Sequence, residues 1–279
     1  EFRRVLFRSI LARSVAEALQ GSLKQSFIVE NKVGAGGNVG ADAVAKSAAD
    51  GYTVLFGIDT AFTVNPHIYK ALPFKPQDLK PVLVMGSSGL LVGAHPATGI
   101  KSLRDLVATG KAKTLNFSSG GNGSPGHLAV EVFMDAAGVK IQHVPYKGNT
   151  PAVTAVVAGE VDAGVLATPG MLPHVKSGRV QALAVTSRQR SKMVPEVPTV
   201  AEAGLKELEL EVLYVAMVPA ATPDAVVQVL QNAMKEALQR PEMQARMAGL
   251  DLFYEGLAGE AAQKRMADLS ARYARIVKA

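Results

Sequence analysis

The stretch TLNFSSGGNGSPGHLAVEVF (114–133) decides the fold class of this sequence. Thr114–Phe117 predict a strand, residues 118–125 form a polar loop, and a helix is expected from about Gly126 to Gly138. Around this unit, strands are expected at 142–144, 163–166 and 182–186, and helices at 102–108, 150–158 and 171–177. Strands that alternate with helices at this rhythm predict βαβ units and a mainly parallel sheet.

The same alternation continues toward both ends of the chain. Helices are expected at 10–24, 39–47, 224–239, 241–248 and 259–277, and strands at 27–30, 52–57, 81–87 continuing as 90–95, and 212–218. The pattern predicts two α/β lobes joined by two crossover strands, near 95–99 and 215–219. We expect lobe one to contain 10–97 and 218–279, and lobe two 98–217. Such a double connection permits hinge closure over a ligand.

Composition narrows the class of protein. The chain is 48% hydrophobic and 19% charged, which is typical of a folded globular protein. It has no cysteine, which excludes disulfides, thiolate metal sites and thiol nucleophiles. The net charge of +6 invites a nucleic-acid interpretation, but the basic residues are scattered and the chain has no Trp. Without a basic stripe interleaved with stacking aromatics, nucleic-acid binding is not predicted.

The first nine residues, EFRRVLFRS (1–9), resemble the translation of a sequencing-library adapter. We predict that they are an artefact joined to an incomplete reading frame, so that natural sequence starts at Ile10. The alternative is a genuine basic start or the charged region of a signal peptide. No apolar segment with a cleavage site follows, which disfavours the signal peptide.

Two glycine-rich loops follow predicted strands. GAGGNVG (34–40) lacks the third glycine of a dinucleotide fingerprint, because position 39 is Val, so a tight strand-to-helix turn is favoured. The loop 118–126 joins two serines and several glycines to a helix N-terminus, which is typical of an anion site. It lacks the Gly-Lys-Ser/Thr of a nucleotide-phosphate loop, and an ordinary polar loop remains the alternative.

Metal and catalytic sites are not predicted. His127 and Glu131 lie one helical turn apart, but no further ligand accompanies them. No Gly-x-Ser-x-Gly motif occurs, and the acids Glu160 and Asp162 are explained by turn chemistry. Asp59 follows a strand without a visible catalytic partner. The residues therefore predict neither an enzyme nor a cofactor.

Five stretches together resemble the Bug family, the substrate-binding proteins of tripartite tricarboxylate transporters. They are VENKVGAGGNVGADAVAKSAADGYTVLFG (29–57), NPHIYKALPF (65–74), SSGGNGSPGHLAVEVF (118–133), VPYKGNTPAVTAVVAGEVDAG (144–164) and EVPTVAEAGL (196–205). The resemblance implies a type II periplasmic-binding-protein fold. It also implies a periplasmic location after export by a signal peptide, which the present chain does not show, and delivery of ligand to membrane permease subunits.

The resemblance also implies which residues bind the ligand. In lobe one they are Asp59, Thr60 and Ala61; in lobe two they are Ser118, Ser119, Gly123, Ser124, His127, Tyr146, Lys147, Gly148, Leu166, Ala167 and Thr168. Tyr146 and Lys147 have the alternative interpretation of a surface strand end. The family's first strand and Pro-Phe-x-x-Gly-Gly loop do not precede Ile10 here, and Leu213-Tyr214-Val215 stands where the family usually has Trp-x-Gly.

The resemblance favours a monomeric solute-binding protein that captures a small organic carboxylate between its lobes for transport. Amino-acid-binding relatives can carry an Asp near the position of Leu166, whereas Leu166-Ala167 offers no charge. Because an unpaired buried ammonium is costly, we expect a ligand without an amine. The alternatives are a periplasmic sensor that signals to a membrane histidine kinase and, in another class, an enzyme on the same fold.

Overall fold

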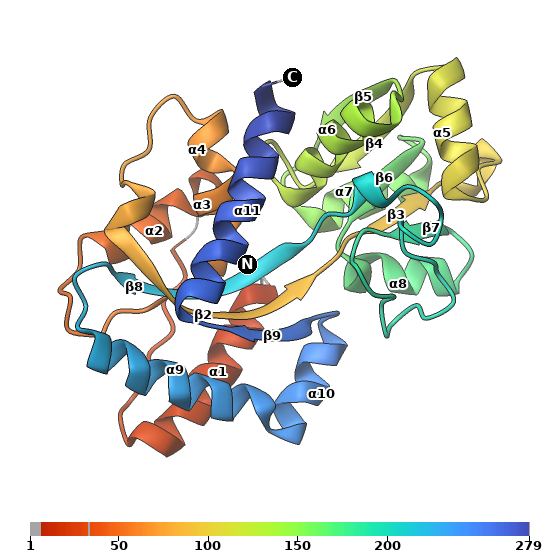
Figure 1. Ribbon diagram of the computed structural model, residues 1–279. Helices are drawn as coiled ribbons and strands as arrows, with labels where there is room; N and C mark the ends of the chain where they lie inside the picture. The colour runs from red at the N-terminus through yellow and green to blue at the C-terminus, as the bar shows by residue number, and fades with distance from the viewer. Residues whose placement is uncertain (1–6, 33, 279) are drawn as a thin grey trace. The chain divides into compact units, whose positions relative to one another are not determined.

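The structure, a computed structural model, describes residues 7–32 and 34–278 and forms two compact units (Figure 1). Unit 1 contains the residues up to Ser87 together with Leu213–Ala274, and unit 2 contains Ser88–Val212 together with the end of α11 from Arg275 on. Both divisions fall earlier than the expected crossings near 95–99 and 215–219, because the strand at 91–94 pairs within the sheet of unit 2. The predicted artefact at 1–9 falls largely outside the described residues.

The sheet of unit 1 has the strand order β1-β8-β2-β9. Its strands are β1 (Leu55–Ile58), β8 (Val212–Pro219), β2 (Leu79–Ser88) and β9 (Phe253–Leu257). The pairs β1–β8 and β2–β9 are antiparallel, so the expectation of mainly parallel pairing is wrong for them. The reason is that β8 and β9 return from the C-terminal part of the chain, and no βαβ crossover joins them to their partners.

Helices cover the sheet of unit 1 and complete its core. The helices of this unit are α1 (Phe7–Leu23), α2 (Asn38–Ala45), α3 (Thr60–Thr63), α4 (Asn65–Ile68), α9 (Asp224–Gln239), α10 (Pro241–Gly249) and α11 (Gly259–Lys278). Helices α1, α9 and α10 lie together on one side of the sheet (Figure 1). Leu11, Val15 and Leu19 recur at helical spacing along α1 and belong to one buried cluster with Met234 of α9.

The expected strand at 27–30 is absent. These residues have no regular secondary structure, and the side chain of Ile28 is 93% exposed. A strand needs a hydrogen-bonded neighbour, and within the described part of the chain none pairs with this segment. The apolar run alone was therefore insufficient to predict a strand.

The sheet of unit 2 has the strand order β5-β4-β6-β3-β7. Its strands are β3 (Leu91–Ala94), β4 (Leu115–Ser119), β5 (Ile141–Pro145), β6 (Ala163–Leu166) and β7 (Gln181–Val185), and its helices are α5 (Leu103–Ala112), α6 (Pro125–Ala137), α7 (Asn149–Ala158) and α8 (Thr168–Lys176). Short 3-10 turns occur at Ala35–Gly37, Pro76–Asp78, Pro96–Thr98 and Lys206–Leu208. The pairs β4–β5 and β4–β6 are parallel, as expected, whereas β3 is antiparallel to β6 and β7.

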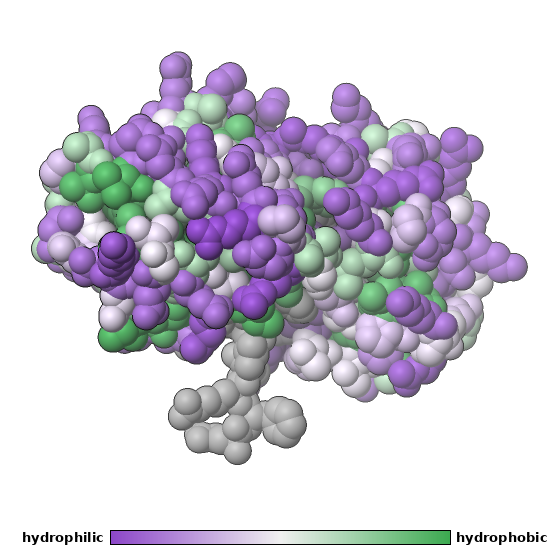
Figure 2. All heavy atoms as spheres, turned by 90° about the horizontal axis from the view of Figure 1, so that it is seen from below, coloured by the Kyte–Doolittle hydropathy of each residue, from purple (hydrophilic) through white to green (hydrophobic). Residues whose placement is uncertain are grey.

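Both units have an apolar interior and a mainly polar surface. In unit 2, α7 and α8 contribute Val153, Val156 and Met171 to one cluster with Leu91 of β3. The face drawn in Figure 2 is mostly hydrophilic, with separate hydrophobic patches. Among the described residues, no helix is both long enough and apolar enough to cross a bilayer.

Candidate ligand-binding site

Three adjacent parallel strands of unit 2 bring their carboxyl ends to one edge of the sheet. Ser118 of β4 is in register with Val144 of β5 and with Gly164 of β6. Each strand is followed by a helix, so the N-termini of α6, α7 and α8 meet at this edge. The free N–H groups of helix N-termini favour an anion there. The ligand residues predicted for lobe two all lie on these three strand-to-helix turns, on the ends of their strands or on the first turn of α6.

The turn between β4 and α6 is shaped by its serines and glycines. Ser124 caps α6, and its Oγ accepts the backbone N–H of His127 at 3.2 Å. Gly121 and Gly123 have positive φ angles of 120° and 73°, which favour glycine. A Cβ on Gly126 would lie 2.5 Å from the carbonyl oxygen of Val165, so α6 starts directly against β6. Serine and glycine are therefore required here by geometry.

Hydrogen bonds tie the three turns to one another. The N–H of Tyr146 donates to the Ser119 carbonyl at 3.0 Å, and that of Gly148 donates to the Gly120 carbonyl at 3.1 Å. Asn149, at the start of α7, accepts the N–H of Ala167 on its Oδ1 at 3.0 Å. The sequence analysis missed Asn149, because nothing in the local pattern indicates a partner 18 residues away.

Some predicted ligand residues already have partners in unit 2, and others do not. The Ser118 hydroxyl donates to the Ala152 carbonyl at 3.0 Å, and Leu166 is buried in the core. The Tyr146 hydroxyl donates to Glu160 at 3.3 Å, and burial, followed by the charge of Glu160, raises its pKa. By contrast, Thr168 Oγ1 is buried without a hydrogen-bond partner at the first residue of α8.

Two imidazoles lie beside the β4–α6 turn. The rings of His127 and His143 have their centroids 4.4 Å apart, and His143 Nε2 lies 2.6 Å from Ser119 Oγ. Burial, followed by the nearby His127, lowers the pKa of His143 to about 4. His127 Nε2 lies 3.3 Å from Glu131. Within the described residues, no group of three or more His, Cys, Asp or Glu side chains is arranged to hold a metal ion.

In unit 1, the predicted residues Asp59, Thr60 and Ala61 are all buried. The Asp59 carboxylate accepts the N–H of Leu213 at 2.9 Å and the hydroxyl of Thr63 at 2.8 Å. Burial raises its pKa to about 6, although these hydrogen bonds oppose the shift. Asp59 therefore fastens α3 to β8 inside the unit, and its role as a ligand contact stays a prediction.

The glycine loop at 34–40 turns tightly into α2, as expected, but it follows an irregular segment and not the expected strand. Gly34, Gly36 and Gly37 all have positive φ angles. Asn65 of α4 is fully buried and holds the loop by donating to Gly36 O at 3.3 Å and to Asn38 Oδ1 at 2.7 Å. This arrangement explains the glycines without a bound nucleotide.

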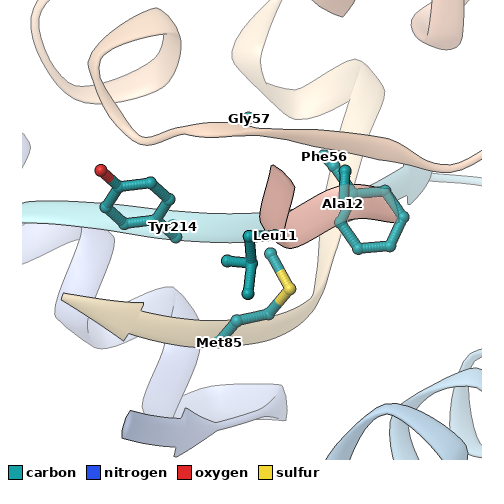
Figure 3. Close-up of a pocket in the computed structure, with 6 residues that line it drawn as sticks. All are labelled: Leu11, Ala12, Phe56, Gly57, Met85 and Tyr214. Carbon is teal, nitrogen blue, oxygen red and sulfur yellow. The ribbon is translucent and has the colours of Figure 1, made fainter. Parts of the chain in front are cut away.

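A small hollow in unit 1 is lined by Leu11, Ala12, Phe56, Gly57, Met85 and Tyr214 (Figure 3). Apart from the Tyr214 hydroxyl, its lining side chains are apolar. A carboxylate needs hydrogen-bond donors or a cation, so this hollow does not suit one. Tyr214 is the central residue of the Leu-Tyr-Val sequence that departs from the family pattern.

Comparison with known proteins places the chain among a family of receptors and their solved relatives. The family described as "Tripartite tricarboxylate transporter family receptor" matches residues 11–279. Protein BugT of Bordetella pertussis is 38% identical over 234 residues, which cover 82% of this chain and 72% of BugT. A solved structure of an R. palustris protein with adipate has 29% identity and a TM-score of 0.86, covering 96% of this chain and 91% of that one. MatC from Rhodopseudomonas palustris with bound malate has 25% identity and a TM-score of 0.80, covering 97% and 94%.

The fold and these likenesses define a periplasmic-binding-protein-like receptor, with two α/β units whose sheets are flanked by helices. The chain belongs to the tripartite tricarboxylate transporter receptor family. The resemblance and the fold class predicted from the sequence are therefore confirmed. The family is one of receptors and its named relatives are binding proteins, so the chain is a solute-binding protein, not an enzyme.

Proposed function

We propose that the chain binds a small organic carboxylate at the three strand-to-helix turns of unit 2. The observation that carries this proposal is the convergence of the N-termini of α6, α7 and α8 at the carboxyl ends of three adjacent strands. Backbone N–H groups at the helix N-termini carry the positive end of the helix dipole and can hold a carboxylate there together with hydroxyls, and Lys147 on the β5–α7 turn adds a cation. The adipate and malate in the solved relatives support the same chemical class.

The same turns favour a ligand without an amine. Residues 118–127, 146–148 and 166–168 contain no Asp or Glu, so the turns offer no carboxylate to an ammonium group. Glu131 is paired with His127, and Glu160 accepts the hydroxyl of Tyr146. A desolvated ammonium left unpaired costs several kcal/mol. Asp59, Thr60 and Ala61 of unit 1 remain proposed contacts on the basis of the family resemblance, but the Asp59 carboxylate already accepts hydrogen bonds from Leu213 and Thr63.

We further propose that the receptor acts in the periplasm as a monomer and passes its ligand to the permease subunits of a tripartite tricarboxylate-type transporter. Membership of the receptor family supports this partner. Deleting the gene is then expected to abolish uptake of the radiolabelled ligand. If uptake persists and only gene induction is lost, the protein is a sensor.

A thermal-shift panel with succinate, malate and adipate tests the binding proposal. A ligand that binds only the folded state raises the melting temperature as its concentration exceeds the dissociation constant. We expect at least one acid to stabilise the protein, and the corresponding dimethyl ester to have no effect. Absence of a shift with all three acids at millimolar concentration, confirmed by calorimetry, would refute the proposed ligand class.

A further inference from the structure

His143 lies beside the binding turns, and the family resemblance implies no role for it. It lies on β5, outside the helix N-termini, and its side chain is partly buried. Its Nε2 atom is 2.6 Å from Ser119 Oγ, one of the shortest side-chain hydrogen bonds in unit 2. Its ring lies against the ring of His127 with a tilt of 32°.

The bond to His143 determines what the Ser119 hydroxyl can do. Ser119 is fully buried, and its Oγ also accepts the N–H of Gly121 at 3.1 Å. The alternative acceptor for its single proton, the Gly121 carbonyl, is 3.3 Å away. With His143 present, the oxygen is held from two sides. Without it, the hydroxyl has only the longer contact with the Gly121 carbonyl, and the Gly121 N–H has a less fixed acceptor.

The stacked ring of His127 extends this support to the other end of the turn. His127 Nδ1 accepts the N–H of Gly123 at 3.3 Å, and Nε2 lies toward Glu131. His143 therefore supports both Gly121, through Ser119, and Gly123, through His127. These two glycines occupy the positive-φ positions that aim the backbone N–H groups of the turn.

The charge state of His143 suits this role. Its pKa is lowered to about 4, so the imidazole is neutral near pH 7, where small carboxylic acids are ionised. The groups that face it are Ser119, the imidazole of His127 and, beyond that ring, Glu131. A neutral ring can both accept and donate, which a charged ring cannot.

We propose that His143 is a positioning residue that holds the β4–α6 turn in its carboxylate-binding conformation through Ser119 and His127. This inference rests on the proposed carboxylate-binding function. His143 itself needs no contact with the ligand, because its effect is transmitted by the hydroxyl and by the stacked ring.

The test compares three substitutions of His143 with one control. In His143→Gln the side-chain amide reaches about as far as Nε2, whereas in His143→Asn it reaches only about as far as Nδ1. His143→Phe keeps a ring for stacking but has no polar atom. His174→Phe, in the last turn of α8, is the matched control. Calorimetry with the tightest-binding acid of the succinate, malate and adipate panel gives the affinities.

We expect the Phe and Asn variants to bind about tenfold more weakly, and the Gln variant and the control to stay within about threefold of the parent protein. Equal affinities for Gln and Asn, or parent-like binding by the Phe variant, would overturn the proposal. If the Phe variant fails to fold, the comparison of Gln with Asn decides on the same criteria.

A second measurement is independent of ligand binding. Amide hydrogen exchange of Gly121, which Ser119 links to His143, is expected to accelerate about tenfold in His143→Asn but not in His143→Gln. Exchange of Gly123, which depends on the ring contact with His127, is expected to accelerate in both variants. If the parent protein binds no acid, the proposed function fails, yet this exchange pattern still tests the positioning role. Unchanged exchange in both variants would refute that role even if the acids bind.

Discussion

Asp59→Asn isolates the cost of burying a carboxylate in unit 1. Its oxygens accept hydrogen bonds from Leu213 and Thr63, yet burial raises its pKa from an ordinary 3.8 to about 6. Asn keeps an oxygen for the Leu213 N–H. It adds an N–H for the Thr63 hydroxyl, which can turn to its other acceptor, the carbonyl of residue 59 at 3.0 Å. The substitution therefore removes the charge and preserves the hydrogen bonds.

Proton binding at Asp59 determines the sign and the size of the expected change in the free energy of unfolding. Between pH 3.8 and about 6 the folded protein binds more protons at Asp59 than the unfolded chain does. The stability that the protonated carboxyl contributes is thus complete below pH 3.8 and is lost as the pH rises through 6. A shift of about two pKa units corresponds to about 3 kcal/mol. Asp59→Asn should gain about that much stability relative to the parent protein between pH 4 and pH 7.5.

Urea unfolding followed by circular dichroism at pH 4, 5, 6 and 7.5 gives the free energy of unfolding for both proteins. Other titrating groups cancel in the difference between them. Asp135→Asn, an exposed acid in unit 2, serves as the control and should show a constant difference. A difference for Asp59→Asn that is independent of pH, or that falls as the pH rises, would refute the reasoning.

Three further predictions concern the binding turns. Ser124→Ala removes the cap of α6 and should cost about 1 kcal/mol in the free energy of unfolding, measured in urea; no loss would contradict the capping role. Gly126→Ala places a Cβ against the Val165 carbonyl and should lower the free energy of unfolding by about 1–3 kcal/mol. Gly249→Ala, the control, has open space around its Cβ and should leave that free energy unchanged. Equal effects of the two substitutions would contradict the close approach of α6 to β6. Asn149→Asp keeps an acceptor for the Ala167 N–H, so the melting temperature should be maintained while carboxylate affinity falls at least about tenfold by charge repulsion. Unchanged affinity would show that the anion binds elsewhere.

Local signals predicted the strand, turn and helix within 114–133 because all their determinants lie close together in the sequence. The strand, the small polar residues and the Ser124-Pro125 helix start are adjacent, and the structure reproduces them. The tight turn at 34–40 was predicted for the same reason, because the missing third glycine of the dinucleotide fingerprint and the need for unusual backbone angles are both visible in the sequence. The strand expected before this turn is absent.

Long-range partners could not be predicted in this way. The strand expected at 27–30 lacks a neighbour among the described residues, and an apolar run does not reveal that. The antiparallel pairing of β1 with β8 joins segments more than 150 residues apart in the sequence, as does the hydrogen bond from Leu213 to Asp59. His143 was placed on a strand but was not linked to Ser119, because their contact depends on the register of β4 with β5.

The most direct test of the central claim is calorimetric titration with succinate and aspartate, which differ only by the ammonium group. If the turns of unit 2 bind a carboxylate and offer no partner to an amine, succinate should bind, and aspartate should bind at least about 100-fold more weakly. Equal or tighter binding of aspartate would contradict the account.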